Sequence, residues 1–150
     1  MPGEDRKGRN IMFKTMLVED NTSYRQAVKN DLQLQFPSMN IIEAADGVEA
    51  FQKIDSQSPN LIFMDISLPG ENGLELTKKI KTDYRDIIII ILTSHDSPEY
   101  REAATRCKAN YFLSKGSITT NEVVKLVRSA LLEKGFNADG SDSKKGDSQL

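Results

Sequence analysis

Five short runs of apolar residues divide the chain, and each is rich in β-branched or aromatic residues. This composition predicts strands at Phe13–Val18, Ile41–Ala45, Leu61–Met64, Ile87–Leu92 and Tyr111–Leu113. Two of the runs, Leu61–Met64 and Ile87–Leu92, contain no polar residue. Strands that are buried on both faces have this pattern, and such strands are typical of parallel sheets.

The segments between these runs carry the signals of helices. Ser97 followed by Pro98 is typical of a helix cap and a first helical residue. Thr119 and Glu122 have the spacing of a capping box. Apolar residues then recur at helical spacing, in one segment Tyr100, Ala103, Ala104 and Cys107 and in another Val123, Val127, Ala130 and Leu131. The other predicted helices are Thr22–Phe36, Gly47–Ile54 and Asn72–Lys81.

A strand followed by a helix, repeated five times, predicts one α/β domain over residues 13–134. Right-handed crossovers place helices on both faces of a parallel sheet, so we expect a doubly wound sandwich with strand order 2-1-3-4-5. The two ends lack this pattern. Residues 1–12 are predicted to be a flexible leader, and residues 135–150, with three glycines among Ser, Asp and Lys, a flexible tail or linker stub.

Composition narrows the class of protein. The 150 residues carry 20 Lys and Arg against 22 Asp and Glu, a formal net charge of −2. This charge gives no positive electrostatic field that would attract nucleic acid or an anionic membrane. A single cysteine excludes an internal disulfide framework and suits a reducing compartment. The longest apolar run, Ile87–Leu92, is too short to span a bilayer. We therefore expect a cytoplasmic protein without membrane contact.

Polar residues stand where the apolar runs stop. Glu19 and Asp20 follow the first run, Asp65 the third and Thr93 the fourth, and Lys115 comes shortly after the fifth. In an open α/β sheet, ligands bind outside the carboxyl ends of the strands, at the point where the winding reverses. The predicted strand order therefore brings these five side chains to one crevice. Taken singly, each also has an ordinary interpretation as a turn cap or a solvated side chain.

Three carboxylates at one place repel each other unless a cation lies among them. Two unit charges 4 Å apart repel by about 4 kcal/mol at an effective dielectric near 20. Because Glu19, Asp20 and Asp65 offer only oxygens, the preferred cation is a partly hydrated Mg²⁺. Lys115 adds a fixed positive charge, and the set suits stabilisation of a transferring phosphoryl group. Asp65 is then the natural acceptor, since a carboxylate can form an acyl phosphate.

Four ordered segments resemble the signature blocks of one known family. They are LVEDN at 17–21, MDISLPGENG at 64–73, ILTS at 91–94 and FLSK at 112–115. They look like those of response-regulator receiver domains of bacterial two-component systems, and the resemblance covers roughly Phe13–Lys134. It implies a CheY-like, flavodoxin-like (βα)5 fold. It also implies phosphoryl transfer from the phosphohistidine of a sensor histidine kinase, or from a phosphotransfer protein, to Asp65.

The same resemblance implies roles for the site residues. The metal would be held by the carboxylates of Asp20 and Asp65 and by the backbone carbonyl of Ser67, with Glu19 acting through a metal-bound water. Thr93 and Lys115 match the groups that contact the phosphoryl oxygens after transfer. The domain would be a phospho-accepting signalling module and not a metabolic enzyme, with slow loss of its own phosphoryl group.

The family's switch would move the Thr93 loop inward on phosphorylation and the aromatic residue Phe112 into the space vacated. Tyrosine is frequent at this position of the family. Phe112 lacks its hydroxyl and should favour burial, although Phe112 can also be interpreted as a simple core residue. The resemblance also implies that Ser67 and His95 occupy positions that tune the lifetime of the phosphoryl group. For His95, a solvated loop histidine and a transition-metal ligand are the alternatives.

Two other functions compete with this interpretation. A Mg²⁺-dependent phosphohydrolase with an Asp nucleophile typically has a second Asp two residues later, where this chain has Ser67. A nucleotide binder would carry G-x-G-x-x-G or G-x-x-x-x-G-K-[ST], and neither occurs.

The segment LSKGS at 113–117 resembles a loop found in receivers that precede helix-turn-helix domains. Nucleic acid would then be contacted only through such an output domain. Homodimerisation on phosphorylation is a further expectation.

Overall fold

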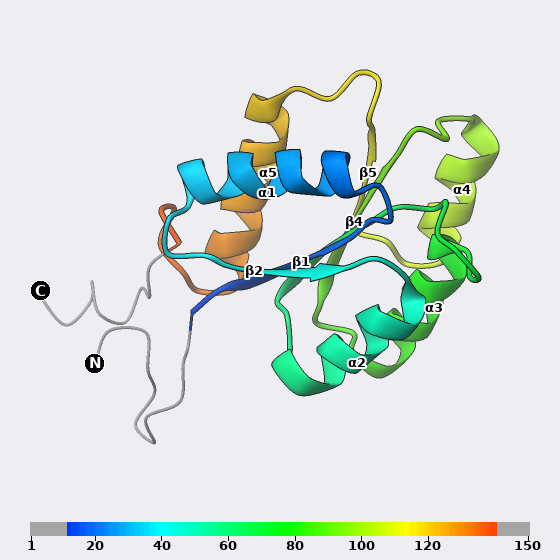
Figure 1. Cartoon of the computed structure of the whole chain (residues 1–150), viewed down its shortest axis with the longest axis horizontal. Helices are drawn as coiled ribbons and strands as arrows, with labels where there is room; N and C mark the ends of the chain where they lie inside the picture. The colour runs from blue at the N-terminus through cyan, green and yellow to red at the C-terminus, as the bar shows by residue number, and fades with distance from the viewer. Residues whose placement is uncertain (1–11, 141–150) are drawn as a thin grey trace, which may run out of the picture.

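Five strands form one parallel sheet in the order β2-β1-β3-β4-β5 in the computed structural model, which describes residues 12–140 (Figure 1). The strands are β1 (Lys14–Val18), β2 (Asn40–Ala44), β3 (Leu61–Met64), β4 (Ile88–Thr93) and β5 (Tyr111–Ser114). All four neighbouring pairs run parallel. The predicted strand order is confirmed, and the predicted strand bounds are correct to within one residue.

Helices cover both faces of this sheet. They are α1 (Thr22–Gln35), α2 (Gly47–Gln57), α3 (Gly73–Asp83), α4 (Pro98–Arg106) and α5 (Thr120–Glu133). In Figure 1, α1 and α5 lie on one side of the sheet, and α2, α3 and α4 lie on the other. The predicted doubly wound sandwich is confirmed. Within residues 12–140, no helix has the length and apolar character needed to cross a membrane.

Side-chain caps begin the helices. Ser97 accepts a hydrogen bond from the backbone of Tyr100, with Pro98 as the first helical residue, and Thr119 accepts one from Glu122. Both predicted caps are therefore confirmed. Asn72, expected inside a helix, is instead the cap of α3, because its Oδ1 accepts from the Leu74 amide at 2.6 Å.

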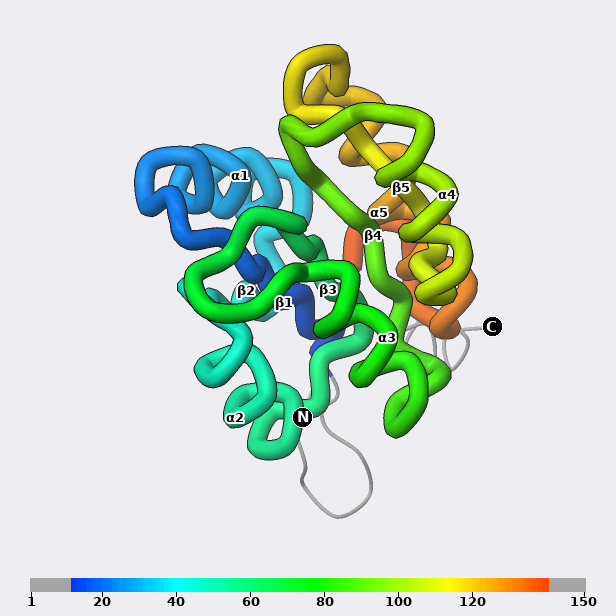
Figure 2. Tube along the Cα trace, turned by 90° about the vertical axis from the view of Figure 1, so that its right-hand side faces the viewer, coloured from blue at the N-terminus to red at the C-terminus, as the bar shows by residue number. Residues whose placement is uncertain are grey.

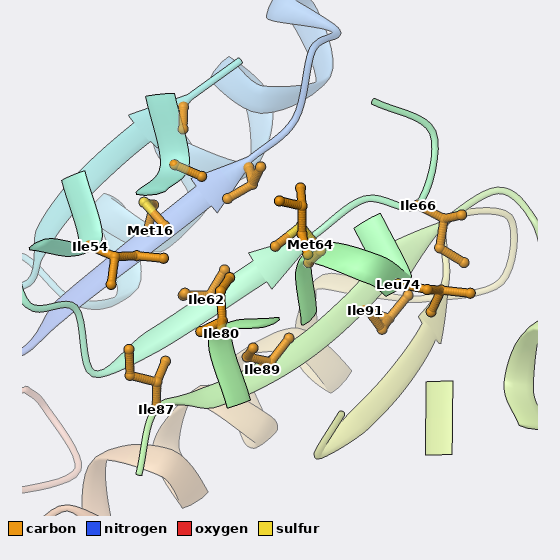
Figure 3. Packing of buried hydrophobic residues seen from close by; sticks show 14 of the residues in the cluster. Met16, Ile54, Ile62, Met64, Ile66, Leu74, Ile80, Ile87, Ile89 and Ile91 are labelled. Atoms are coloured by element: carbon orange, nitrogen blue, oxygen red, sulfur yellow. The ribbon is translucent and has the colours of Figure 1, made fainter. Parts of the chain in front are cut away.

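Alternate residues of each central strand enter two separate apolar clusters. Met64 and Ile91 join the cluster beneath α2, α3 and α4, which is shown in Figure 3. Their neighbours Phe63 and Ile90 join the cluster beneath α1 and α5. This alternation explains why β3 contains no polar residue and β4 none before Thr93, since a polar side chain on either face would be buried without water.

The carboxyl ends of the strands lie together on one side of the molecule, the side that faces the viewer in Figure 2. Backbone pairing continues one residue beyond the regular strands there: the Glu19 amide donates to Ala44, and the Asp65 amide donates to Val18 at 3.1 Å. Glu19 and Asp65 are thereby held next to each other at the ends of two adjacent strands.

Packing at the carboxyl end of the chain extends beyond α5. The ring of Phe136 meets the ring of Phe13 edge-on, 5.3 Å between centroids, and the Phe136 amide donates to Leu131. The domain boundary at residue 134 stays a prediction, but residues up to Phe136 pack against the second cluster. The predicted leader, apart from Met12, and residues 141–150 of the predicted tail lie outside the described residues.

Candidate functional site

Three carboxylates meet at the edge where β1 and β3 end. One oxygen each of Glu19, Asp20 and Asp65 lies within 4.8 Å of the others. Glu19 and Asp65 are buried, each 6% exposed, whereas Asp20 is exposed. The cluster is therefore half enclosed by the protein and half open to solvent, an arrangement that lets a ligand reach it from one side.

Lys115 reaches this cluster from the loop after β5, the edge strand. Its Nζ lies 2.5 Å from Glu19 Oε1 and 3.2 Å from Asp65 Oδ2. The Lys115 amide also donates to the Thr93 carbonyl, so the backbone holds the base of the side chain in place. The ammonium offsets part of the negative charge that burial would otherwise make costly.

The pKa directions follow from this arrangement. Burial raises the pKa of Glu19. The hydrogen bond from Lys115 opposes this rise, and the nearby charge of Asp65 adds to it. Burial disfavours the Lys115 ammonium, but the hydrogen bond with Glu19 and the charge of Asp65 outweigh it and raise the pKa of Lys115. Lys115 is consequently a fixed cation at neutral pH.

Backbone contacts shape the loop that follows Asp65. The Gly73 amide, at the start of α3, donates to the Ile66 carbonyl at 2.9 Å, and the Ser67 amide lies 3.4 Å from Asp65 Oδ1. These hydrogen bonds bring the two ends of the loop from 65 to 73 together at the start of α3. They keep the Asp65 side chain at the carboxyl end of β3.

Thr93 and Phe112 lie on neighbouring strands. Thr93 is fully buried at the end of β4, and its Oγ1 accepts a hydrogen bond from the His95 amide at 3.3 Å. Phe112 does not join the carboxylates. It is half-buried against the first cluster, and the Arg101 guanidinium lies 4.7 Å from the centroid of its ring. Arg101 in turn pairs with Asp96 at 2.6 Å.

Ser67 and His95 contact each other across two loops. Ser67 Oγ lies 2.5 Å from His95 Nε2, which joins the loop after β3 to the loop after β4. The His95 ring also contacts the ring of Tyr100. The structure thus brings together two residues that the sequence separates by 28 positions.

Tyr24 is a residue of this site that the sequence analysis missed. Lys115 Nζ lies over its ring, 4.3 Å from the centroid, and burial raises the pKa of the Tyr24 phenol. Asn21 caps α1 and accepts from the Tyr24 amide. The sequence signal for Tyr24 is the helix cap at Asn21, which directly follows Glu19 and Asp20 and places Tyr24 in the first turn of α1.

The donor set suits a hard divalent cation. Its ligand atoms are oxygens, two of the three carboxylates are buried, and one ammonium balances only part of their charge. Oxygen-only sites with a few carboxylates and room for water are typical of Mg²⁺. The residues present therefore fit the metal that the sequence predicts.

The chain is similar to known proteins over most of its described length. The model of the response regulator receiver domain family matches residues 15–128. The oxygen regulatory protein NreC of Staphylococcus carnosus is 35% identical over 106 residues, which are 70% of this chain and 49% of that protein. The chain thus spans about half the length of the curated relatives it matches.

Solved structures share the fold. A LuxR-family DNA-binding response regulator from Staphylococcus aureus has a TM-score of 0.73 and 26% identity, covering 79% of this chain and 98% of that one. A CheY-like receiver domain protein from Methanospirillum hungatei has a TM-score of 0.75 and 23% identity, covering 81% and 95%. The chain belongs to the response regulator receiver domain family, and so to two-component signalling.

Proposed function

We propose that this receiver domain accepts a phosphoryl group on Asp65 from the phosphohistidine of a sensor histidine kinase or a phosphotransfer protein. The observation that carries the proposal is the position of Lys115, whose ammonium lies within 3.2 Å of both buried carboxylates while Asp20 stays open to solvent. A fixed cation beside a carboxylate at an accessible edge is what phosphoryl transfer requires.

The transfer exchanges one bond for another. A carboxylate oxygen of Asp65 attacks the phosphorus, a P–O bond forms, and the P–N bond breaks. The electron pair of that bond leaves with the donor imidazole, which takes up a proton. Lys115 donates to the phosphoryl oxygens, and the Thr93 hydroxyl turns to donate to another of them. Both groups stabilise negative charge that spreads over these oxygens.

Mg²⁺ is the cofactor that we propose for this reaction. Asp20, Asp65 and the Ser67 backbone carbonyl would hold it, with Glu19 acting through a bound water. When bound, the metal supplies positive charge that offsets charge on the phosphoryl oxygens. The support is the three carboxylate oxygens within 4.8 Å of one another.

The test is labelling by a small phosphodonor. After incubation with acetyl phosphate and Mg²⁺, mass spectrometry should find one phosphoryl group on the peptide that contains Asp65. Asp65→Asn, or EDTA, should abolish the label, whereas Asp83→Asn, at the far end of α3, should leave it unchanged. Label on another residue, or label that persists in Asp65→Asn, would rule out the proposal.

The same labelled sample tests the switch. We propose that Thr93 moves toward the phosphoryl group and that Phe112 shifts with it, away from the Arg101 guanidinium that now lies over its ring. Aromatic NMR signals of Phe112 should therefore change with the label, and size-exclusion chromatography would report dimer formation. Signals that stay unchanged in fully labelled protein would exclude the switch.

We propose that Ser67 and His95 set the lifetime of the phosphoryl group. Their side chains contact each other at 2.5 Å, and Ser67 lies two residues after Asp65 on the loop that follows it. Loss of one hydrogen bond in His95→Ala should speed decay by about 2- to 10-fold. The measurement is loss of label after the donor is removed. Ser67→Ala should have a similar effect, and unchanged decay in both variants would contradict the role.

The wider setting of the domain is also a proposal. Because the chain spans about half of its curated relatives, and one similar structure is described as a LuxR-family DNA-binding response regulator, we propose that it serves as the receiver of a longer regulator in the cytoplasm. Contact with nucleic acid would then fall to the other part of that protein.

A further inference from the structure

We propose that Tyr24 is a positioning residue for Lys115: its ring holds the ammonium beside Glu19 and Asp65, so that the ammonium can follow the phosphoryl group when it arrives. This inference rests on the function proposed for Asp65. The contact that carries it is the 4.3 Å between Lys115 Nζ and the centroid of the Tyr24 ring. A cation at this distance from an aromatic face is attracted by it.

The backbone fixes where the Tyr24 ring lies. Asn21 Oδ1 accepts from the Tyr24 amide at 3.0 Å, which holds the first turn of α1. The next residue, Arg25, donates to the Glu19 carbonyl at 2.5 Å and to Glu43 Oε1 at 3.0 Å. These hydrogen bonds fix the start of α1 against the ends of β1 and β2, so the Tyr24 ring is held in one position beside Lys115.

Lys115 needs a fixed contact of this kind because its hydrogen-bond partners change during the reaction. The ammonium has three N–H donors and now uses Glu19 and Asp65 as acceptors. When Asp65 carries a phosphoryl group, the best acceptors are the new phosphoryl oxygens. The attraction to a ring face does not depend on hydrogen-bond direction, so Tyr24 retains the ammonium while its hydrogen bonds are exchanged.

The ring also stands between two spaces. Tyr24 lines a small cavity together with Glu19 and Asp65, and it lines a cleft of about 210 Å³ between α1 and α5 together with Lys115 and Asp31. Removal of the ring would enlarge the space beside the ammonium. The ammonium could then turn toward the cleft, where water and the Asp31 carboxylate compete for it.

The experiment compares Tyr24→Phe, which keeps an aromatic face, with Tyr24→Leu, which does not. The rate of Asp65 labelling by acetyl phosphate at saturating Mg²⁺ should fall about fivefold in Tyr24→Leu and stay within about twofold of the original in Tyr24→Phe. Tyr111→Leu, which removes an exposed tyrosine from β5, is the matched control and should not change the rate.

Two further readouts separate positioning from a general structural role. Ring-current shifts of the Lys115 side-chain protons should persist in Tyr24→Phe and vanish in Tyr24→Leu. In a Lys115→Met background, Tyr24→Leu should cause no additional loss of labelling rate, because its effect passes through Lys115. If urea unfolding shows that Tyr24→Leu does not fold, Tyr24→Met takes its place.

The outcomes are distinct. Full labelling rate in Tyr24→Leu, or an equal slowing with and without Lys115, would overturn the role of Tyr24. Absence of label on Asp65 in the original protein would instead refute the proposed function, and the ring-current shifts of Lys115 in the unlabelled protein would still decide whether Tyr24 holds the ammonium.

Discussion

Gly73→Ala should destabilise the domain by about 3 kcal/mol and abolish labelling of Asp65, because the added methyl has no space. A Cβ at Gly73 would lie 1.9 Å from the Asp65 carbonyl oxygen and 2.9 Å from the Ile66 Cα. These are backbone atoms and cannot rotate away as a flexible side chain does. Either α3 or the loop from 65 must shift, and the loop carries the proposed acceptor.

A second glycine gives the matched control. Gly116→Ala would place its Cβ 3.9 Å from the nearest atom, Ser114 Oγ, so the substitution should leave stability unchanged or raise it by about 0.4–1 kcal/mol through the unfolded chain. Urea unfolding measures both variants. Equal midpoints for Gly73→Ala and Gly116→Ala would show that the start of α3 adapts to a methyl group.

The strand order and the meeting of the carboxylates were predictable because they follow from backbone rules. Apolar runs without polar residues indicate central parallel strands, and parallel strands end at one edge. Glu19 and Asp65 follow such runs directly, so their proximity needs only the correct strand order. The strand bounds shifted by one residue, as at Asn40, because backbone pairing with β1 and not side-chain polarity decides where a strand begins.

The side-chain contacts were less predictable, because they depend on how helices sit over the sheet. The sequence places Lys115 near the carboxylates, but its short contact with Glu19 depends on the path of the loop after β5. The positions of Tyr24 beneath the ammonium and of Arg101 over Phe112 depend on the orientation of α1 and α4. Spacing along the chain does not contain these orientations.

Lys115→Met should lower the free energy of unfolding by about 3 kcal/mol at pH 7, because it leaves Glu19 and Asp65 buried side by side without a cation. Loss of one partner from a buried ion pair is costly since the remaining charges stay desolvated. Added Mg²⁺ should restore part of the loss, because it supplies positive charge at the same place. Chemical unfolding with and without Mg²⁺ measures both effects.

The effect of Lys115→Met should depend on pH in a defined direction. In the original protein the pKa of Lys115 is raised, so the stability it contributes is present below the ordinary value of 10.5 and is lost as the pH rises through the raised pKa. In the variant, Glu19 loses the hydrogen bond that opposes the effect of burial, so its pKa rises further above 4.5. The stability that this raised pKa contributes to the variant is fully present below pH 4.5, and it is lost as the pH rises through the raised pKa of Glu19.

The two proteins should therefore be most alike near pH 4 and most different between pH 7 and the ordinary pKa of Lys115 at 10.5. Lys29→Met is the matched control, because Lys29 pairs with Glu43 at 3.0 Å but both side chains are partly exposed. Its cost should stay below about 1 kcal/mol, and it should decrease only as the pH falls below 4.5, because Lys29 lowers the pKa of Glu43. A loss in Lys115→Met that is no larger than in Lys29→Met, or that is the same at pH 4 and pH 8, would show that Lys115 does not neutralise the buried carboxylates.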